Sequence, residues 1–230
     1  MAYFIGLDLG GTNIKAGLVD ETARVIASDS WPTHAQKGPD HVIETMASIA
    51  ESVANTATIS LGDVDAIGIG SPGPLDFDLG VIKAMPNMPG WENVPLRDSI
   101  ATKTGRPAVL ENDANAAAFG EFWAGAGREA SIRHMVMLTL GTGIGTGAIV
   151  SGKLLHGANG LGGEGGHMIV QPNGRQCGCG QRGCLETYAS ASHTLKRTIE
   201  ALENGEDSTL TQVYKKDPKS LSTKVIFEAA

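Results

Sequence analysis

The chain has 230 residues, a formal net charge of −7 and 41% hydrophobic residues. This length and apolar content suffice for one large domain or two modest lobes. An acidic chain without a lysine and arginine cluster lacks the positive potential that nucleic acid requires, so we expect no nucleic-acid partner. No apolar run reaches the length of a membrane span, and the opening residues enter a predicted strand directly, so we expect a cytoplasmic protein without a membrane partner.

The first predicted structure is a group of three strands, Tyr3–Asp8, Ile14–Val19 and Arg24–Trp31. The first two are joined by the turn from Asp8 through Gly10, Gly11 and Thr12. Glycine leaves backbone N–H groups open to phosphate oxygens, and the Asp8 carboxylate suits a magnesium ion. An ordinary hairpin turn is the alternative.

A helix is predicted over Asp40–Asn55, where apolar residues recur at helical spacing and Asp40 is placed to cap the start. A buried strand, Ala66–Gly70, then enters the turn Ser71–Pro74, which contains Gly73. The glycines let a ligand lie close to the backbone, although a purely structural turn is the competing interpretation.

Polar residues follow the next short strand, Pro107–Leu110, at the start of a predicted helix, Ala114–Ala126. Phosphoryl transfer to a hydroxyl needs a carboxylate that orients the hydroxyl and takes its proton. Asp113 is the residue that we assign to this role, because ligands bind at strand ends in open α/β sheets. The alternative is that Asp113 only caps the helix.

The strand and glycine-turn pattern occurs a second time. Met135–Leu140 is followed by a glycine turn that contains Gly141, Thr142 and Gly143, and then by the strand Thr146–Val150. Two such units predict a duplicated fold with one phosphate turn in each half. The glycine spacing does not match a dinucleotide-binding motif, since a strand and not a helix follows.

All three cysteines lie in the stretch Glu164–Glu186. Cys177, Cys179 and Cys184 cannot all pair as disulfides, but with His167 they complete the four ligands of a structural zinc ion. Three reduced cysteines buried as small hydrophobic residues are the alternative. The glycines between them make this segment a poor core element, which favours zinc.

Two acids, Glu164 and Glu186, flank this loop, and carboxylates accept hydrogen bonds from paired hydroxyls, which indicates a polyol site. The runs Glu164–His167 and Cys177–Glu186 resemble the motif of the ROK family of sugar kinases, and bacterial glucokinases resemble it most. The resemblance implies that Glu164 and Glu186 bind sugar hydroxyls and that His167 binds zinc and touches the sugar. Gly165 departs from the bulky apolar residue common in the family.

The same resemblance assigns other residues. It implies that Asp113 is the catalytic base, that Asn112 binds a sugar hydroxyl, and that Gly73 and Asn87 lie next to the sugar. It also implies an actin-like ATPase (ribonuclease H-like) duplicated α/β fold with two lobes around a cleft, residues 1–113 and 114–230. Family chains continue through further helices and a third glycine motif, so we expect the second lobe to be incomplete. Past Glu186 we expect helices over Thr187–Asn204 and Ser222–Ala230.

We therefore predict an ATP-dependent glucokinase with Mg²⁺, a structural Zn²⁺, a hexose substrate and a homodimeric or homotetrameric assembly. One alternative is a ROK kinase for N-acetylglucosamine, N-acetylmannosamine, mannose or fructose. A second alternative is a non-catalytic sugar-binding fragment. A sugar-responsive repressor of the family is disfavoured, because only seven residues precede Asp8. We expect His156 to be a surface residue and Lys15 to be a solvated side chain.

Overall fold

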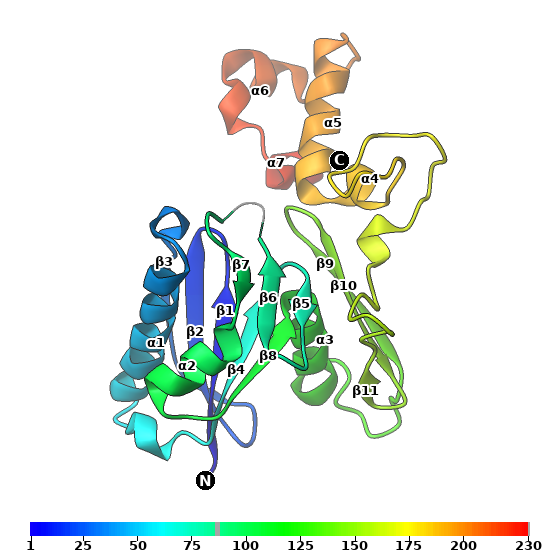
Figure 1. Ribbon diagram of the computed structural model, residues 1–230. Coiled ribbons are helices and arrows are strands. Elements are labelled where there is room, and N and C mark those ends of the chain that lie inside the picture. Colours follow the sequence, from blue (N-terminus) through cyan, green and yellow to red (C-terminus); the bar gives the residue numbers. More distant parts are fainter. Residues whose placement is uncertain (86–87, 230) are drawn as a thin grey trace. The chain divides into compact units, whose positions relative to one another are not determined.

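The computed structural model describes residues 1–85 and 88–229 (Figure 1). The chain forms two compact units. The first consists of Met1–Val136 and Gly147–Gly162, and the second consists of Met137–Thr146 and Gly163–Ala230. The lobes expected over residues 1–113 and 114–230 stay a prediction.

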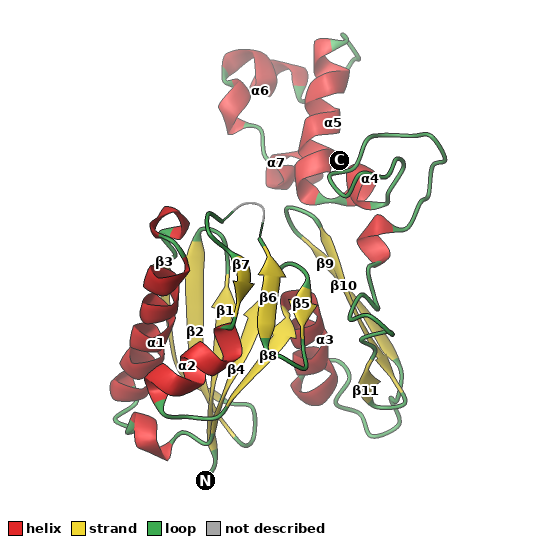
Figure 2. Ribbon diagram, viewed as in Figure 1, coloured by secondary structure: helices red, strands yellow, loops and turns green. Residues whose placement is uncertain are grey.

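A five-stranded sheet lies at the centre of the first unit, with the order β3-β2-β1-β4-β8 (Figure 2). Its strands are β1 (Tyr3–Leu9), β2 (Asn13–Asp20), β3 (Val25–Pro32), β4 (Ala66–Ser71) and β8 (Ala108–Asn112). β1, β2 and β3 are antiparallel, whereas β4 and β8 run parallel to β1. All five strands were expected from the sequence, and their presence is confirmed.

A second, smaller sheet of the first unit has the order β5-β6-β7. Its antiparallel strands are β5 (Leu75–Asp76), β6 (Val81–Ala84) and β7 (Glu92–Val94). The sequence did not predict this sheet, because strands this short contain too few alternations of apolar and polar residues to be recognised.

The helices of the first unit are α1 (Pro39–Thr56), α2 (Leu96–Thr104) and α3 (Asp113–Ala124), with 3₁₀ turns at Ala35–Lys37 and Leu61–Asp63. α1 packs on β2 and β3 through an apolar face, and its buried residues are Val42, Ile43, Met46, Ile49, Ala50, Val53 and Ala54. Burial of each large side chain stabilises the fold by about 1.5–3 kcal/mol. The expected cap by Asp40 is wrong, because Gly38 is the N-cap and Pro39 the first helical residue.

A three-stranded sheet with the order β11-β10-β9 repeats the pattern of β1 to β3. Its strands are β9 (Met135–Leu140), β10 (Ile144–Val150) and β11 (Lys153–Leu154). The turn between β9 and β10 contains the second predicted glycine motif, as the turn between β1 and β2 contains the first. The predicted repeat of strand, glycine turn and strand is therefore confirmed.

After a 3₁₀ turn, Gly165–His167, the second unit continues as a long loop and then as short helices. These are α4 (Glu186–Ala189), α5 (Ala191–Glu203), α6 (Thr211–Lys216) and α7 (Thr223–Glu228), with a 3₁₀ turn at Pro218–Ser220. A single helix over Thr187–Asn204 is wrong. Ser190 adopts an extended conformation and its hydroxyl caps α5 by accepting from the His193 N–H, so the helix is broken there.

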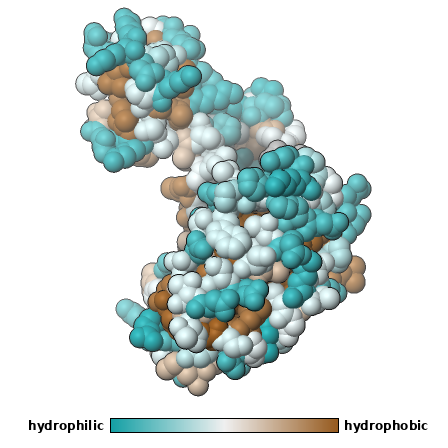
Figure 3. Space-filling model, turned by 90° about the vertical axis from the view of Figure 1, so that its left-hand side faces the viewer, coloured by the Kyte–Doolittle hydropathy of each residue, from teal (hydrophilic) through white to brown (hydrophobic). Residues whose placement is uncertain are grey.

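The surface seen in Figure 3 is mainly polar, with apolar side chains gathered in patches. On β9 the large exposed side chains are those of Val136, Leu138 and Leu140. Among the described residues, none of the helices has both the length and the apolar character needed to cross a membrane.

Candidate functional site

Three parallel strands of the first unit end next to one another. Asp8 of β1 pairs with Gly70 of β4, and Ser71 of β4 pairs with Asn112 of β8. The carboxyl ends of parallel strands are where open α/β sheets bind ligands. The structure thus brings together the two strand ends that the sequence selected, one with Asp8 and one with Asn112 and Asp113.

The turn after β1 is tight and its residues Gly11 and Thr12 are exposed. The Gly10 N–H donates to the Asn13 carbonyl over 3.1 Å, and a Cβ at Gly10 would lie 2.6 Å from that oxygen. Only glycine fits there without displacing backbone. Lys15, opposite Asp8 in the hairpin, places its Nζ 3.5 Å from Asp8 Oδ2, so it is paired with the carboxylate although it is largely exposed.

Asn112 and Asp113 have different roles at the start of α3. Asn112 is the N-cap, and its Oδ1 accepts from the N–H groups of Ala114 and Asn115 at 3.0 and 3.1 Å. This use of the oxygen leaves the Asn112 amide NH₂ as the end that can donate to a ligand. The alternative in which Asp113 is the cap is wrong, because Asp113 is the first helical residue.

Asp113 is exposed to solvent, yet partial desolvation by the atoms around it raises the pKa of its carboxyl. The negative charge of Asp8 raises this pKa further, against the lowering by the Ala114 N–H. A carboxylate with a raised pKa is a stronger base, which suits proton abstraction from a hydroxyl. This shift has the direction that the predicted role of Asp113 requires.

Glu111 and His156 form a pair that sequence analysis missed. His156 Nε2 lies 2.7 Å from Glu111 Oε2, while Glu111 Oε1 accepts from the Asn115 Nδ2 and the Asn112 N–H at 3.0 and 2.9 Å. The His156 ring also packs on Phe77, with 4.7 Å between ring centroids. His156 is therefore half-buried and bonded, and the expectation of a plain surface histidine is wrong. Nothing local in the sequence marks a contact between residues 45 positions apart.

The turn after β4 contains Gly73, whose φ is 90°, in the left-handed region that favours glycine. A Cβ there would also lie 3.0 Å from the Ala84 carbonyl. The predicted sugar contact of Gly73 stays a prediction. Asn87, the other residue predicted near the sugar, lies outside the described residues.

The second glycine turn, between β9 and β10, is linked to one of the predicted sugar ligands. Glu186 Oε2 accepts from the Ile144 N–H over 3.0 Å. A Cβ at Gly143 would lie 2.2 Å from the same oxygen, so glycine is required for the carboxylate to reach this position. Gly141 and Thr142 are exposed at the tip of the turn.

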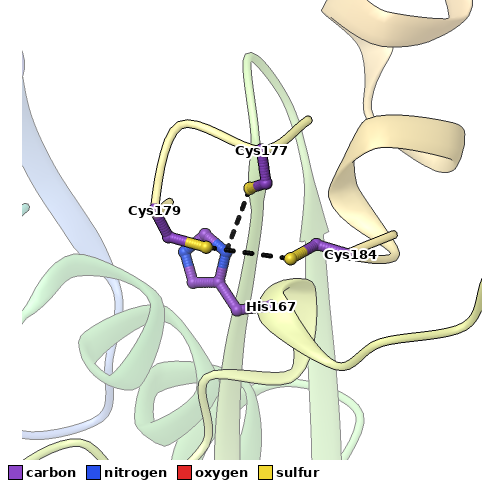
Figure 4. Close-up of side chains that lie close together, drawn as sticks. All are labelled: His167, Cys177, Cys179 and Cys184. Atoms are coloured by element: carbon purple, nitrogen blue, oxygen red, sulfur yellow. Dashed lines mark hydrogen bonds between the residues drawn. The ribbon is translucent and has the colours of Figure 1, made fainter. Parts of the chain in front are cut away.

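His167, Cys177, Cys179 and Cys184 point toward one another (Figure 4). Their ligand atoms all lie within 4.8 Å of one another. His167 Nδ1 is 3.6 Å from Cys177 Sγ, and Cys179 Sγ is 3.7 Å from Cys184 Sγ. The predicted set of one histidine and three cysteines is thus assembled in the second unit.

These distances fit a tetrahedral zinc site. An ion about 2.3 Å from each sulfur and about 2.0 Å from the nitrogen would place sulfurs about 3.8 Å apart and nitrogen about 3.5 Å from sulfur. Burial raises the pKa of Cys184 to about 12 and also raises the pKa of Cys177, whereas the Gln181 N–H lowers the pKa of Cys179. Binding a metal ion here would therefore release protons from at least the two buried thiols.

The segment before the cysteines packs closely on β10. A Cβ at Gly166 would lie 2.2 Å from the Ile144 carbonyl, and one at Gly165 would lie 2.8 Å from the Thr146 hydroxyl. A side chain at Gly165, which departs from the family pattern, would therefore have to displace the Thr146 side chain. Glu164 Oε2 lies 4.0 Å from His167 Nε2, on the ring edge opposite the cysteine that His167 faces.

Comparison with known proteins identifies the family. The family model described as the ROK family matches residues 4–230. The chain belongs to the ROK family. A glucokinase from Thermotoga maritima is 43% identical over 227 residues, which are 98% of this chain and 69% of that protein.

Two solved ROK structures resemble this chain. A ROK hexokinase from Thermus thermophilus is 40% identical with a TM-score of 0.76, over 94% of this chain and 70% of that one. A ROK glucokinase from Streptomyces griseus, in complex with glucose and AMPPNP, is 35% identical with a TM-score of 0.75, over 89% of this chain and 62% of that one. The predicted family and the actin-like ATPase fold class are confirmed. The roles of the individual site residues stay predictions.

Proposed function

We propose that this ROK protein is an ATP-dependent glucokinase that transfers the γ-phosphoryl group to the 6-hydroxyl of glucose. The observation that carries the proposal is the Asp113 carboxylate, solvent-accessible and with a raised pKa, beside Asn112 at the end of β8. The similarity to a glucokinase and to a glucose-bound ROK structure supports glucose as the substrate.

Asp113 acts as the general base. Its carboxylate accepts the proton of the 6-hydroxyl while that oxygen forms a bond to the γ-phosphorus, and the bond from the γ-phosphorus to the leaving oxygen of ADP breaks. The products are glucose 6-phosphate and ADP, with the proton held by Asp113 until it passes to solvent.

The residues proposed for hexose recognition bind sugar hydroxyls. In the first unit the free Asn112 amide donates to a sugar hydroxyl, and Gly73 and Asn87 complete its proposed set. In the second unit Glu164 and Glu186 accept from hydroxyls, and His167 contacts the sugar. A site that pairs with hydroxyls in this way discriminates strongly against a sugar that lacks one, because its own polar groups are then left unpaired.

Gly10, Gly11 and Thr12 and the corresponding Gly141, Thr142 and Gly143 are the proposed phosphate-binding turns, through backbone N–H groups. MgATP, when bound, supplies the phosphoryl group and a cation that neutralises its charge. Asp8 is the residue that would hold Mg²⁺, through water. Lys15 lies 3.5 Å from Asp8 and would be displaced from the carboxylate or would share it.

His167, Cys177, Cys179 and Cys184 are the proposed ligands of a structural zinc ion, which would fix the loop that presents Glu164 and Glu186. A homodimer or homotetramer in the cytoplasm stays the expected state of the protein.

The first test is ADP release, coupled to an indicator enzyme, with MgATP and a panel of glucose, mannose, fructose, N-acetylglucosamine and N-acetylmannosamine. We expect a kcat/KM for glucose far above that of the others. A higher value for an N-acetylated sugar would identify a ROK kinase of different specificity. Release with none of the sugars, together with glucose binding by calorimetry, would instead indicate a sugar-binding protein without turnover.

Asp113→Asn tests the base. We expect kcat to fall by about 10²–10⁴, because this is the range that general base catalysis contributes, while glucose binding measured by calorimetry is retained. Because the raised pKa means that the folded protein disfavours the ionised form, the neutral asparagine should not lower the melting temperature at pH 7. Near-normal turnover would remove Asp113 from this role.

A further inference from the structure

Thr33 makes two hydrogen bonds to the first glycine turn. Its hydroxyl donates to the Gly10 carbonyl over 2.6 Å, and its backbone N–H donates to the Thr12 carbonyl over 2.9 Å. The side chain is fully buried, directly after β3. One residue, more than 20 positions away in the sequence, thus holds the carbonyls of the turn at two points.

The second glycine turn is held in the same way by the start of α5. The Ala191 N–H donates to the Gly141 carbonyl over 2.9 Å, and the Ser192 hydroxyl donates to the Thr142 carbonyl. Here two successive residues supply the N–H and the hydroxyl that Thr33 supplies alone. The arrangement is therefore present in both halves of the duplicated fold, in each case within one unit.

The hydrogen bonds have a direct consequence for anion binding. Carbonyl oxygens repel phosphate oxygens, so a turn binds phosphate only when its carbonyls point away and its N–H groups point outward. In the described part of the chain, the N–H groups of Gly11, Thr12, Thr142 and Gly143 have no protein acceptor. The two hydroxyls thus fix the carbonyls and leave the N–H groups of the same turns available.

We propose that Thr33 and Ser192 are positioning residues that hold the two glycine turns in the conformation that binds the phosphates of the nucleotide. This inference rests on the proposed kinase function. Each residue acts through its turn, so its removal should weaken nucleotide binding and leave glucose binding unchanged.

The two positions differ in the expected size of the effect. Thr33 is fully buried, so in Thr33→Val the Gly10 carbonyl loses its hydrogen-bond partner and water cannot take the place of the hydroxyl. Ser192 is exposed, so water can replace its hydroxyl in Ser192→Ala. We expect the dissociation constant for MgAMPPNP to rise about tenfold in Thr33→Val and about threefold in Ser192→Ala, from a loss of about 0.5–1.5 kcal/mol per hydrogen bond.

The experiment measures MgAMPPNP and glucose dissociation constants by calorimetry on the 230-residue chain, with KM for MgATP and kcat where turnover is present. Thr33→Ser keeps the hydroxyl and should restore nucleotide affinity. Thr45→Val and Ser220→Ala are matched controls, because they remove hydroxyls that donate to the His41 and Asp217 carbonyls, over 2.8 and 2.7 Å, away from the turns. Melting temperatures compare the variants with their controls.

The inference predicts weaker nucleotide binding in Thr33→Val and Ser192→Ala, with glucose binding unchanged, and normal binding in Thr33→Ser and both controls. Unchanged nucleotide binding in Thr33→Val, an equal loss for glucose, or an equal loss in Thr45→Val would overturn it. So would a wild-type chain that binds no nucleotide. A wild-type chain that binds MgAMPPNP but phosphorylates no sugar would contradict the proposed function alone, since the nucleotide titrations still test Thr33 and Ser192.

Discussion

The two glycine turns share a backbone arrangement but are supported by different interactions. Around the first turn, Leu7, Leu9 and Ile14 are at most 2% exposed and belong to a large apolar core. Before the second turn, Leu138 and Leu140 of β9 are 51% and 65% exposed. There the support is polar, through Glu186, which binds the Ile144 N–H and lies 3.8 Å from Cys177 Sγ. The same local structure can thus be stabilised by apolar burial or by a polar contact from the cysteine-containing loop.

Removal of zinc should have the largest effect, and it should affect the second glycine turn and not the first. Structural zinc sites contribute on the order of 10 kcal/mol to the folding of small domains, so chelation should unfold the loop Glu164–Glu186 and weaken glucose binding. Cys184→Ser should have the same effect without a chelator. The measurements are metal analysis, with one zinc expected per chain, and limited proteolysis of the loop. A purified chain that contains no zinc yet binds glucose would contradict the assignment.

A cavity in the apolar core should destabilise the first region without any dependence on metal. Ile67→Ala removes a fully buried side chain from β4 and should cost about 2–5 kcal/mol of unfolding free energy. Val25→Ala, at a position that is 62% exposed, is the control and should cost little. Denaturant titration with and without chelator checks this. If chelation changed the loss of unfolding free energy caused by Ile67→Ala, the apolar core around the first turn would depend on the metal, against this prediction.

Substitutions of Glu186 test the polar support of the second turn. Glu186→Gln keeps an oxygen that can accept from the Ile144 N–H, so it should mainly weaken glucose binding, by about 10–100-fold for one hydrogen bond to a charged group. Glu186→Ala leaves that N–H without its acceptor, so it should raise the KM for MgATP as well. Steady-state kinetics with both substrates varied distinguishes the two results. Equal KM values for MgATP in both variants would show that the Ile144 contact does not matter.

The smallest expected effect concerns acid stability of the first region. The Thr22 hydroxyl, with the N–H groups of Thr22 and Arg24, lowers the pKa of Asp20 from 3.8 to about 2. A lowered pKa contributes stability that is present above pH 3.8 and is lost as the pH falls toward 2. Asp20→Asn should therefore lower the free energy of unfolding at pH 7. The same variant should also lose less of this free energy than the wild type as the pH falls from 3.8 to 2. Unfolding titrations across that pH range measure it, and an unchanged slope would contradict the assignment.

Local patterns allowed much of the fold and the site to be predicted. Short apolar runs next to glycine-containing turns marked β1, β2 and β4, and helical spacing marked α1. The cysteine spacing, with His167, led to a four-ligand cluster that the structure assembles. These features depend on residues close in the sequence or on a ligand set with few chemical alternatives.

What the sequence could not predict depends on contacts between distant segments. Thr33 reaches Gly10 and His156 reaches Glu111 only after the chain has folded, and neither pattern is visible in a local window. The break at Ser190 was missed because no local pattern marks it. The Ser190 hydroxyl accepts from the His193 N–H, and the Ala191 N–H donates to the Gly141 carbonyl outside the helix. At α1, Gly38 replaced Asp40 as the cap because Pro39 fixes the first helical residue.

The position of Glu186 has a thermodynamic consequence. One carboxylate oxygen holds the N–H that follows the second glycine turn, while the other is near the cysteine cluster. If a sugar hydroxyl binds this carboxylate, as proposed, it changes the charge available to the Ile144 N–H, and the affinities for sugar and nucleotide become linked. By reciprocity, the factor by which glucose changes nucleotide affinity must equal the factor by which nucleotide changes glucose affinity. A single side chain would then set the degree of synergy between the two substrates.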